Sequence, residues 1–282
     1  MTDESSPPVA DGAGRRPQGA YIHGHAESVL RAYQWRTAGN CAAYLLPVLR
    51  PGMDLLDVGC GPGTITVDLA LAVAPGRALG IDLSGEVLVR AAELAEARHA
   101  DNLVFDTGDV YELGYPDARF DVVHAHQVLQ HLSDPVAALR EMRRVTRPRG
   151  VVAVRDAEHA SMVWYPESEG LTEWIRVYRA VAAATGARHD AGRHLLGWAR
   201  RAGFSDVTPS ASTWCFATPG ERTWWANQWA ERFTASAISE RAVADGVATR
   251  DSLRAIARAW QQWAANNDAW FALVHGEVLA RR

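Results

Sequence analysis

The sequence predicts an α/β protein built on a doubly wound parallel sheet with helices on both faces. Between residues 53 and 155, short apolar runs typical of strands alternate with helical stretches of about 10–15 residues, the pattern of successive βαβ units. The chain has 282 residues, 48% of them hydrophobic, and a formal charge of −4. This composition suits one large core with a smaller appendage, and it argues against disorder and against nucleic acid as the main partner.

Each element of the first half has a local signal. A helix over 26–49 carries an apolar stripe and ends before Pro51-Gly52, which breaks it. Ser84 precedes another helical stretch and can cap its first turn. Strands are expected at 53–58, 78–83, 102–106, 120–125 and 150–155, and helices between them at 64–74, 84–99 and 135–146.

After residue 156 helical stretches dominate. Seven of the 11 tryptophans lie between Trp214 and Trp270, so this part of the chain has an apolar cluster of its own. Helices are expected at 168–185, 192–202, 219–244 and 251–265, and strands at 206–216 and 269–279.

The most informative segment is LLDVGCGPGTITVDLA, residues 55–70, in which a strand leads through a glycine-rich turn into a helix. Glycines let the backbone turn sharply and approach a ligand, and the turn directs free N–H groups toward the crevice above the strand ends. The alternative is a tight turn without a ligand. The turn contains Gly59, Cys60, Gly61 and Gly63, and we interpret Cys60 as a small filler rather than a nucleophile.

Two cofactor classes use such a turn. A dinucleotide fingerprint requires glycine three residues after Gly61, where this chain has Thr64. Asp57 instead suits a ligand that carries an ammonium group, because a carboxylate repels a pyrophosphate. Asp82 lies 21 residues after Gly61, at the end of the second strand, where a carboxylate can bind ribose hydroxyls.

These segments resemble the class I S-adenosylmethionine (SAM) methyltransferases. Residues 55–63 are similar to motif I of that family, and FDVVHAHQVLQHLSDP (residues 120–135) and RRVTRPRGVVAVRD (residues 143–156) resemble its UbiE-like, quinone-biosynthesis branch. The resemblance implies a seven-stranded Rossmann-like sheet, six strands parallel and the last antiparallel, with a helical cap. It also implies SAM as cofactor and S-adenosyl-L-homocysteine as product, with Asp109 at the position of an acid that contacts the adenine amino group. The cofactor-binding residues are then expected to be Tyr21, Asp57, Gly59, Cys60, Gly61, Gly63, Asp82, Leu83, Asp109, Val110 and His126.

Two flanking segments suggest a narrower group. YIHGHAESVLRAYQWRT (residues 21–37) and WCFATPGERTWW (residues 214–225) look like segments of methyltransferases that act on microbial secondary metabolites, including the fungal dithiol S-methyltransferases. The first segment is expected to be either an ordered hook or a lid over the cofactor.

Histidines are the expected bases if the acceptor must lose a proton. His126, His131 and His25 are the catalytic candidates, for proton removal or for positioning. The alternatives are that His131 holds its loop by a hydrogen bond and that His126 only packs. His124 and His126 form an H-x-H pair without a third ligand at convincing spacing, so no metal site is expected.

Aromatic residues of 219–244 are the candidates for the acceptor pocket. They either attach the helices to the sheet or line a pocket for an apolar molecule. The expected substrate-binding residues are Trp224, Trp225, Trp229 and Phe233.

The expected organisation has six parts. They are a disordered leader (1–19), an N-terminal helical lid (20–50), a SAM-binding core (51–160), a helical insertion (161–190), the rest of the core (191–216 and 268–282) and a Trp-rich helical cap (217–267).

The sequence therefore predicts a SAM-dependent methyltransferase that acts on a thiol, hydroxyl or other nucleophile of an apolar small molecule, in secondary metabolism. The alternatives are a catalytically silent SAM-binding protein and a nicotinamide-dependent oxidoreductase. Three widely spaced cysteines and the lack of a long apolar run favour a cytoplasmic protein without a membrane partner. A homodimer is left open.

Overall fold

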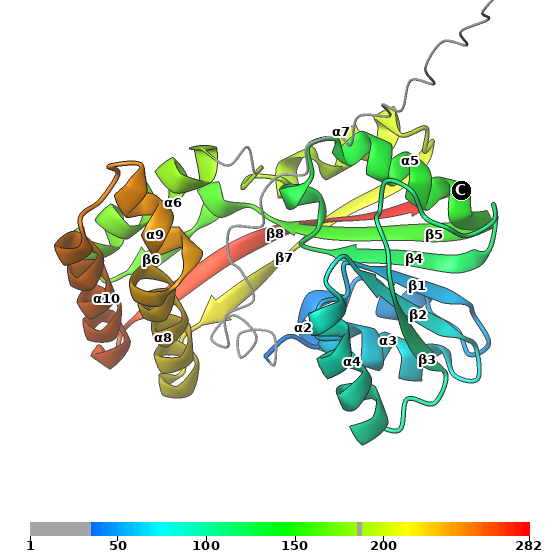
Figure 1. Cartoon of the computed structure of the whole chain (residues 1–282), viewed down its shortest axis with the longest axis horizontal. Coiled ribbons are helices and arrows are strands. Elements are labelled where there is room, and N and C mark those ends of the chain that lie inside the picture. The colour runs from blue at the N-terminus through cyan, green and yellow to red at the C-terminus, as the bar shows by residue number, and fades with distance from the viewer. Residues whose placement is uncertain (1–34, 185–187) are drawn as a thin grey trace, which may run out of the picture.

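The computed structural model describes residues 35–184 and 188–282. The expected leader and most of the expected lid, including Tyr21 and His25, lie outside the described residues. The described chain forms one sheet with helices on both faces, and a second group of helices beside the far end of its longest strands (Figure 1).

The helices and strands follow the expected alternation. The strands are β1 (Leu55–Val58), β2 (Ala78–Asp82), β3 (Leu103–Thr107), β4 (Phe120–His126), β5 (Thr146–Ala157), β6 (Val163–Tyr165), β7 (Asp206–Phe216) and β8 (Trp270–Arg281). The α-helices are α2 (Ala38–Cys41), α3 (Thr64–Val73), α4 (Gly85–Ala97), α5 (Pro135–Val145), α6 (Glu169–Ala184), α7 (Leu195–Arg201), α8 (Pro219–Ala235), α9 (Ala237–Ala244) and α10 (Arg250–Ala265).

The sheet has the order β3-β2-β1-β4-β5-β8-β6, and β7 pairs with β8. Strands β1 to β5 pair in parallel, whereas β8 is antiparallel to β5, β6 and β7. The doubly wound sheet with an antiparallel last strand is thus confirmed. It contains one strand more than the seven expected, because β8 extends beyond β5 and the three residues of β6 pair with that extension.

Two expected helices are different in the structure. The described part of 26–49 holds only the short α2, which ends at Cys41, and a 3₁₀ turn over Leu46–Val48, in which Pro47 lacks the N–H that a continuing helix needs. The expected helix over 219–244 is divided at Ser236, which has an extended backbone with φ −130°. The Ser236 hydroxyl donates to the carbonyl of Arg232 at 2.6 Å and accepts from the N–H of Ile238 at 3.2 Å, so it ends α8 and caps α9.

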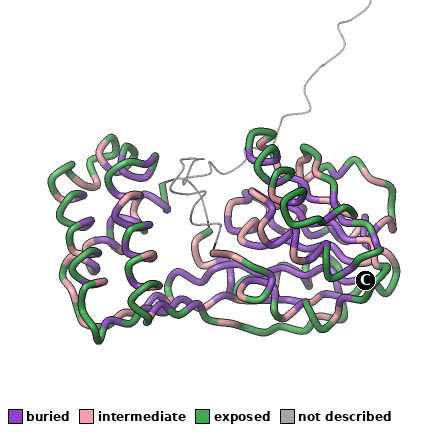
Figure 2. Tube along the Cα trace, turned by 90° about the horizontal axis from the view of Figure 1, so that it is seen from below, coloured by how far each residue is buried: buried purple, intermediate pink, exposed green. Residues whose placement is uncertain are grey.

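Helices α6, α8, α9 and α10, called the cap helices below, share an aromatic core. Trp174 of α6 meets Trp229 of α8 and Trp260 of α10 in edge-to-face contacts, with ring centroids 4.6 Å and 4.8 Å apart. All three rings are fully buried. Figure 2 shows the buried positions along the strands and on the inner sides of these helices, so most of the tryptophans attach the cap helices to one another and to the sheet.

Candidate cofactor and acceptor site

The glycine turn between β1 and α3 brings bare backbone to the carboxyl edge of the sheet. Gly59 has φ +67°, and a Cβ there would lie 2.5 Å from the side chain of Val128. Gly61 has φ +54°, and a Cβ there would meet nothing within 4 Å. The backbone at Gly61 therefore faces open space that a ligand can enter.

Asp57 lies at the end of β1, directly beneath this turn. Its side chain is buried, with one carboxylate oxygen 2.7 Å from Nδ1 of His124 and the other accepting a hydrogen bond from the Thr66 hydroxyl at 2.5 Å. Thus β4 and α3 both hold this carboxylate at the floor of the site. His124 is fully buried in the sheet.

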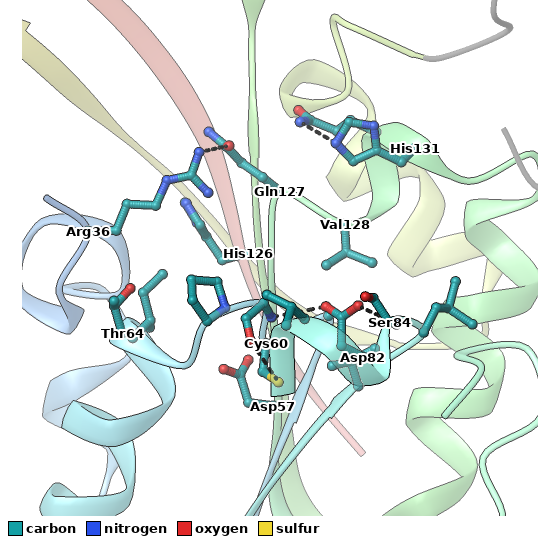
Figure 3. Close-up of a pocket in the computed structure, with 18 of the residues that line it drawn as sticks. Arg36, Asp57, Cys60, Thr64, Asp82, Ser84, His126, Gln127, Val128 and His131 are labelled. Carbon is teal, nitrogen blue, oxygen red and sulfur yellow. Dashed lines mark hydrogen bonds between the residues drawn. The ribbon is translucent and has the colours of Figure 1, made fainter. Parts of the chain in front are cut away.

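Asp82 connects β2 to the glycine turn. One carboxylate oxygen accepts from the N–H of Gly61 and the other from the N–H of Ser84, both at 3.0 Å (Figure 3). Each oxygen retains a lone pair for a ligand hydroxyl. The neighbouring Leu83 is 60% exposed at the edge of the site.

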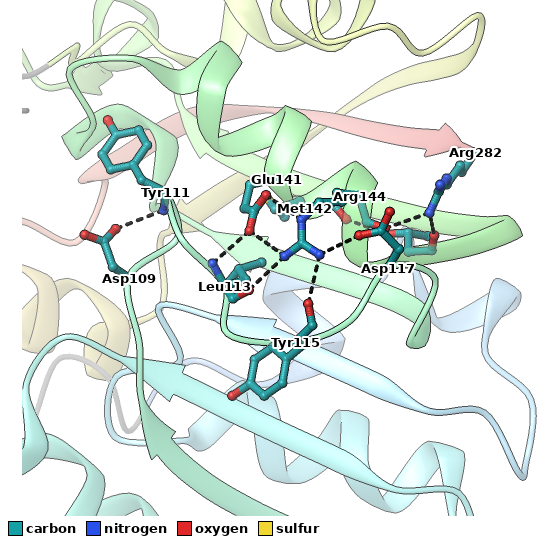
Figure 4. A network of polar contacts seen from close by, with 10 residues as sticks. Asp109, Tyr111, Leu113, Tyr115, Asp117, Glu141, Met142, Arg144 and Arg282 are labelled. Carbon is teal, nitrogen blue, oxygen red and sulfur yellow. Dashed lines mark hydrogen bonds and ion pairs between the residues drawn. The ribbon is translucent and has the colours of Figure 1, made fainter. Parts of the chain in front are cut away.

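The loop after β3 brings Asp109 and Val110 to the same edge. Asp109 accepts from the N–H of Tyr111 at 2.9 Å. Arg144 of α5 holds the rest of the loop by donating to the carbonyl oxygens of Leu113 and Tyr115, each at 2.8 Å (Figure 4). This network positions Asp109 from outside the site.

These parts enclose one cavity of about 510 Å³ between the sheet and the cap helices. That volume is within the range of small-molecule sites. The carboxyl end of β4 forms its middle, with His126, Gln127 and His131. Its far side comes from β7, β8, the cap helices and the segment after β5, and consists of His159, Met162, Tyr178, Trp214, Trp224, Trp225, Trp229, Arg232 and Leu273.

The cavity brings together most of the residues that the sequence singled out, with two exceptions among those described. Phe233 is fully buried and packs against Trp229, with ring centroids 6.2 Å apart, so it does not line the cavity. Gly63 also lies behind the lining, where a Cβ would come within 3.1 Å of Ala91 and Phe105. Its role is close packing of the turn against α4. Cys60 lines the cavity, and burial raises the pKa of its thiol, which keeps it protonated as a filler.

The two described histidine candidates are neutral, with His126 buried and His131 partly buried. His126 is 7% exposed, and both of its ring nitrogens lack a hydrogen-bond partner among the described residues. Burial, with Arg155 and Arg36 nearby, lowers its pKa well below the usual range. Burial likewise lowers the pKa of His131 to about 4, and its Nε2 lies 3.1 Å from the side-chain nitrogen of Gln130. Both rings therefore carry no charge at pH 7.

Several lining residues were missed by the sequence reasoning. Gln127 has φ +53°, uncommon for a non-glycine residue, at the point where β4 ends. His159 follows the end of β5, and since ligands bind at the carboxyl ends of parallel strands, that position was a usable signal. Trp35, Arg36 and Trp214 lie in the two flanking segments that suggested a narrower group, but no pattern marked them individually, and none marked Tyr178 or Arg232.

Comparison with known proteins identifies the family. A methyltransferase domain model matches residues 49–203, which contain the glycine turn, Asp82, Asp109 and the end of β4. This chain belongs to the class I SAM-dependent methyltransferases. An uncharacterized methyltransferase of Schizosaccharomyces pombe is 35% identical over 270 residues, covering 93% of this chain and 96% of that protein.

Two further comparisons place this methyltransferase within the family. The ubiquinone/menaquinone biosynthesis C-methyltransferase UbiE of Bdellovibrio bacteriovorus is 37% identical over 105 residues, which is 37% of this chain and 44% of that protein. The YcgJ protein of Bacillus subtilis has the same fold, with a TM-score of 0.55 and 18% identity over 85% of this chain and 97% of its own. The UbiE-like resemblance and the Rossmann-like fold are thus confirmed.

The methyltransferase uses SAM, and its described residues fit that cofactor. Gly61 offers open backbone for a close approach, Asp82 keeps a lone pair on each oxygen for a hydroxyl, and Asp109 places a carboxylate beside Val110. Family membership excludes the nicotinamide-dependent alternative. Within residues 35–184 and 188–282, no helix combines the length and the apolar character needed to cross a bilayer.

Proposed function

We propose that this methyltransferase methylates sulfur or oxygen of a compact, largely apolar small molecule that binds between β4 and the cap helices. The observation that carries the proposal is the continuity of the cavity, which extends from the glycine turn to an aromatic wall without interruption. Trp224, Trp225 and Trp229 of α8 supply that wall, opposite the cofactor residues. Flat apolar surfaces of this kind suit a planar or apolar acceptor better than a nucleic acid or a protein tail.

When bound, SAM supplies a methyl group already activated on a sulfonium. The chain's task is therefore to bind and orient the acceptor and to exclude water, and such positioning can contribute roughly 7–11 kcal/mol to lowering a barrier. Asp57, Asp82 and Asp109 hold the cofactor side in place, while the buried aromatic side chains keep the acceptor side dry.

His126 is proposed to position the acceptor. It lies where the cofactor and acceptor sides meet, and its neutral ring can accept a hydrogen bond from an acceptor thiol or hydroxyl. Its lowered pKa makes it a weak base, so we assign it orientation rather than full proton removal. His131 has the same limitation, and His25 stays a prediction outside the described residues.

A screen of acceptors tests the proposal. The protein is incubated with SAM and sets of thiols, phenols, amines and quinols, and products are detected by a mass increase of one methyl group. Formation of S-adenosylhomocysteine with apolar thiols or phenols supports it, and no turnover with any small molecule would favour the catalytically silent alternative. Turnover confined to RNA or protein substrates would contradict the acceptor assignment.

The biological setting proposed is small-molecule secondary metabolism in the cytoplasm. The supporting observations are the apolar acceptor wall and the three cysteines, which are all free, as in a reducing compartment.

A further inference from the structure

Charge is distributed unequally over the cavity. Its cofactor side contains three carboxylates, Asp57, Asp82 and Asp109. On its acceptor side the charged lining residues, among those the structure describes, are the guanidinium groups of Arg36 and Arg232. A cofactor with a cationic centre and an amino group suits the first side, and the second side suits a ligand of the opposite sign.

Arg232 is an unusual residue for an aromatic layer. It is 9% exposed on α8, and its guanidinium carbon lies 5.0 Å from the ring centre of Trp229. Removing an arginine from water is costly, so a buried arginine needs hydrogen-bond acceptors or charges of the opposite sign around it. Arg232 lines the cavity, so a ligand bound there can be one of these partners.

His159 and Tyr178, which line the cavity together with Arg232, are uncharged. His159 Nδ1 lies 2.5 Å from the carbonyl oxygen of His189, so this nitrogen carries the proton and Nε2 accepts. The Tyr178 hydroxyl, 3.2 Å from both His159 Nε2 and His189 Nδ1, then donates to the first and accepts from the second. Burial lowers the pKa of His159 to about 4 and that of His189 to about 3, and it raises that of Tyr178.

Beneath the cavity lie one ion pair and one carboxyl with a raised pKa. Arg155 and Glu277 form a buried pair with a nitrogen–oxygen distance of 3.2 Å. Burial raises the pKa of Asp156 to about 8, so this carboxyl is mostly protonated at pH 7. Arg36, which donates to the Gln127 side chain at 2.8 Å, and Arg232 are thus the charged groups that line the acceptor side, among the residues that the structure describes.

We propose that the acceptor binds as an anion, with its negative charge held by Arg232 and Arg36 and its flat body against the tryptophans of α8. This inference rests on the proposed function and adds the charge class of the acceptor. An anionic acceptor also removes the need for a strong base, which the buried histidines do not provide. In either of two cases the acceptor carries one negative charge: the charge lies on the reacting atom, or it lies on a separate carboxylate.

Binding of matched aromatic probes tests the inference. Isothermal titration calorimetry is performed with 2-naphthoate and with its neutral counterpart 2-naphthamide, on protein saturated with S-adenosylhomocysteine. We expect 2-naphthoate to bind about tenfold more tightly, the effect of one charge-assisted hydrogen bond. Arg232→Gln should bring the two affinities together, while Arg232→Lys should keep part of the preference. The control is Arg254→Gln on α10, an exposed arginine that pairs with Asp251 and should leave the preference unchanged.

The outcomes separate the two proposals. If the parent protein fails to bind S-adenosylhomocysteine, the result counts against the proposed function. If the cofactor-bound parent protein binds the two probes equally, or does not bind 2-naphthoate, only the proposal of an anionic acceptor is overturned. An unchanged preference in Arg232→Gln would also overturn it. A second arm titrates 2-naphthalenethiol between about pH 5 and 9. Affinity that rises with thiol ionisation places the charge on the reacting atom, and affinity that does not rise places it on a separate carboxylate.

Discussion

Gln127 and His275 lie 148 positions apart in the chain and meet with their side-chain nitrogens 3.0 Å apart. The Gln127 oxygen accepts from Arg36 at 2.8 Å, which assigns the amide orientation and leaves its nitrogen to donate to His275 Nε2. His275 is therefore neutral, with its proton on Nδ1, in agreement with a pKa that burial holds well below the usual range. One side chain thus connects the segment before α2, the end of β4 and the middle of β8.

Replacing Gln127 with leucine should lower stability. The substitution leaves a guanidinium and a buried imidazole without this partner, at a cost of about 1–3 kcal/mol in the free energy of unfolding. Urea denaturation monitored by circular dichroism measures it. The matched control is Gln261→Leu, an exposed position on α10, which should change stability by less than about 0.5 kcal/mol. Equal effects at the two positions would mean that the Gln127 bridge adds nothing to folding.

Replacing Asp82 with alanine should weaken SAM binding. The variant loses the carboxylate that holds the N–H groups of Gly61 and Ser84 and that faces the ribose position, so affinity should fall by about 1.5–3 kcal/mol. Calorimetric titration with S-adenosylhomocysteine measures the loss, and the thermal shift caused by the ligand should decrease with it. Asp101→Ala, at an exposed position before β3, is the control. Parent-like affinity in Asp82→Ala would contradict the ribose assignment.

Replacing Asp156 with asparagine should stabilise the protein increasingly as pH rises. Asp156 is fully buried, and its pKa is raised from 3.8 to about 8, so between these values the folded state keeps a proton that the unfolded state releases. Stability contributed by this group is therefore lost as pH rises from about 4 to 8, with a limiting slope of about 1.4 kcal/mol per pH unit.

Asparagine is neutral at every pH and can still accept the hydrogen bond from the N–H of Gln130, which lies 3.2 Å from Asp156 Oδ1. The test compares the two proteins by urea denaturation at several pH values, so that opposing contributions from His131 and His159 cancel in the difference. A difference that stays constant between pH 5 and 8 would show that Asp156 is ionised in the folded protein.

The cofactor side was accessible to sequence reasoning because its chemistry is local. Asp57, the glycines and α3 lie within one strand–turn–helix unit, and the parallel sheet places the ends of β2 and β3 beside it. Only Gly63 was misplaced, since its neighbours on α4 and β3 are distant in sequence.

The acceptor side depends on contacts that no local pattern contains. Arg36, His159 and Arg232 come from three separate parts of the chain and meet only in the folded protein. The split between α8 and α9 was also missed, because it depends on the hydrogen bonds of the Ser236 hydroxyl rather than on apolar periodicity.

Replacing Trp224 with leucine should separate acceptor binding from folding. Its ring is half-buried, lines the cavity and stacks on Trp35 with centroids 5.4 Å apart, whereas Trp225 and Trp229 line the cavity but are also buried in the aromatic core. Loss of one aromatic contact should weaken the acceptor by about 0.5–1.5 kcal/mol, roughly two- to twelvefold in Kd, with little effect on S-adenosylhomocysteine binding. The control is Trp270→Leu, 41% exposed and outside the cavity. Calorimetry with 2-naphthoate measures both variants, and an equal loss in both would show that the α8 tryptophans act on folding alone.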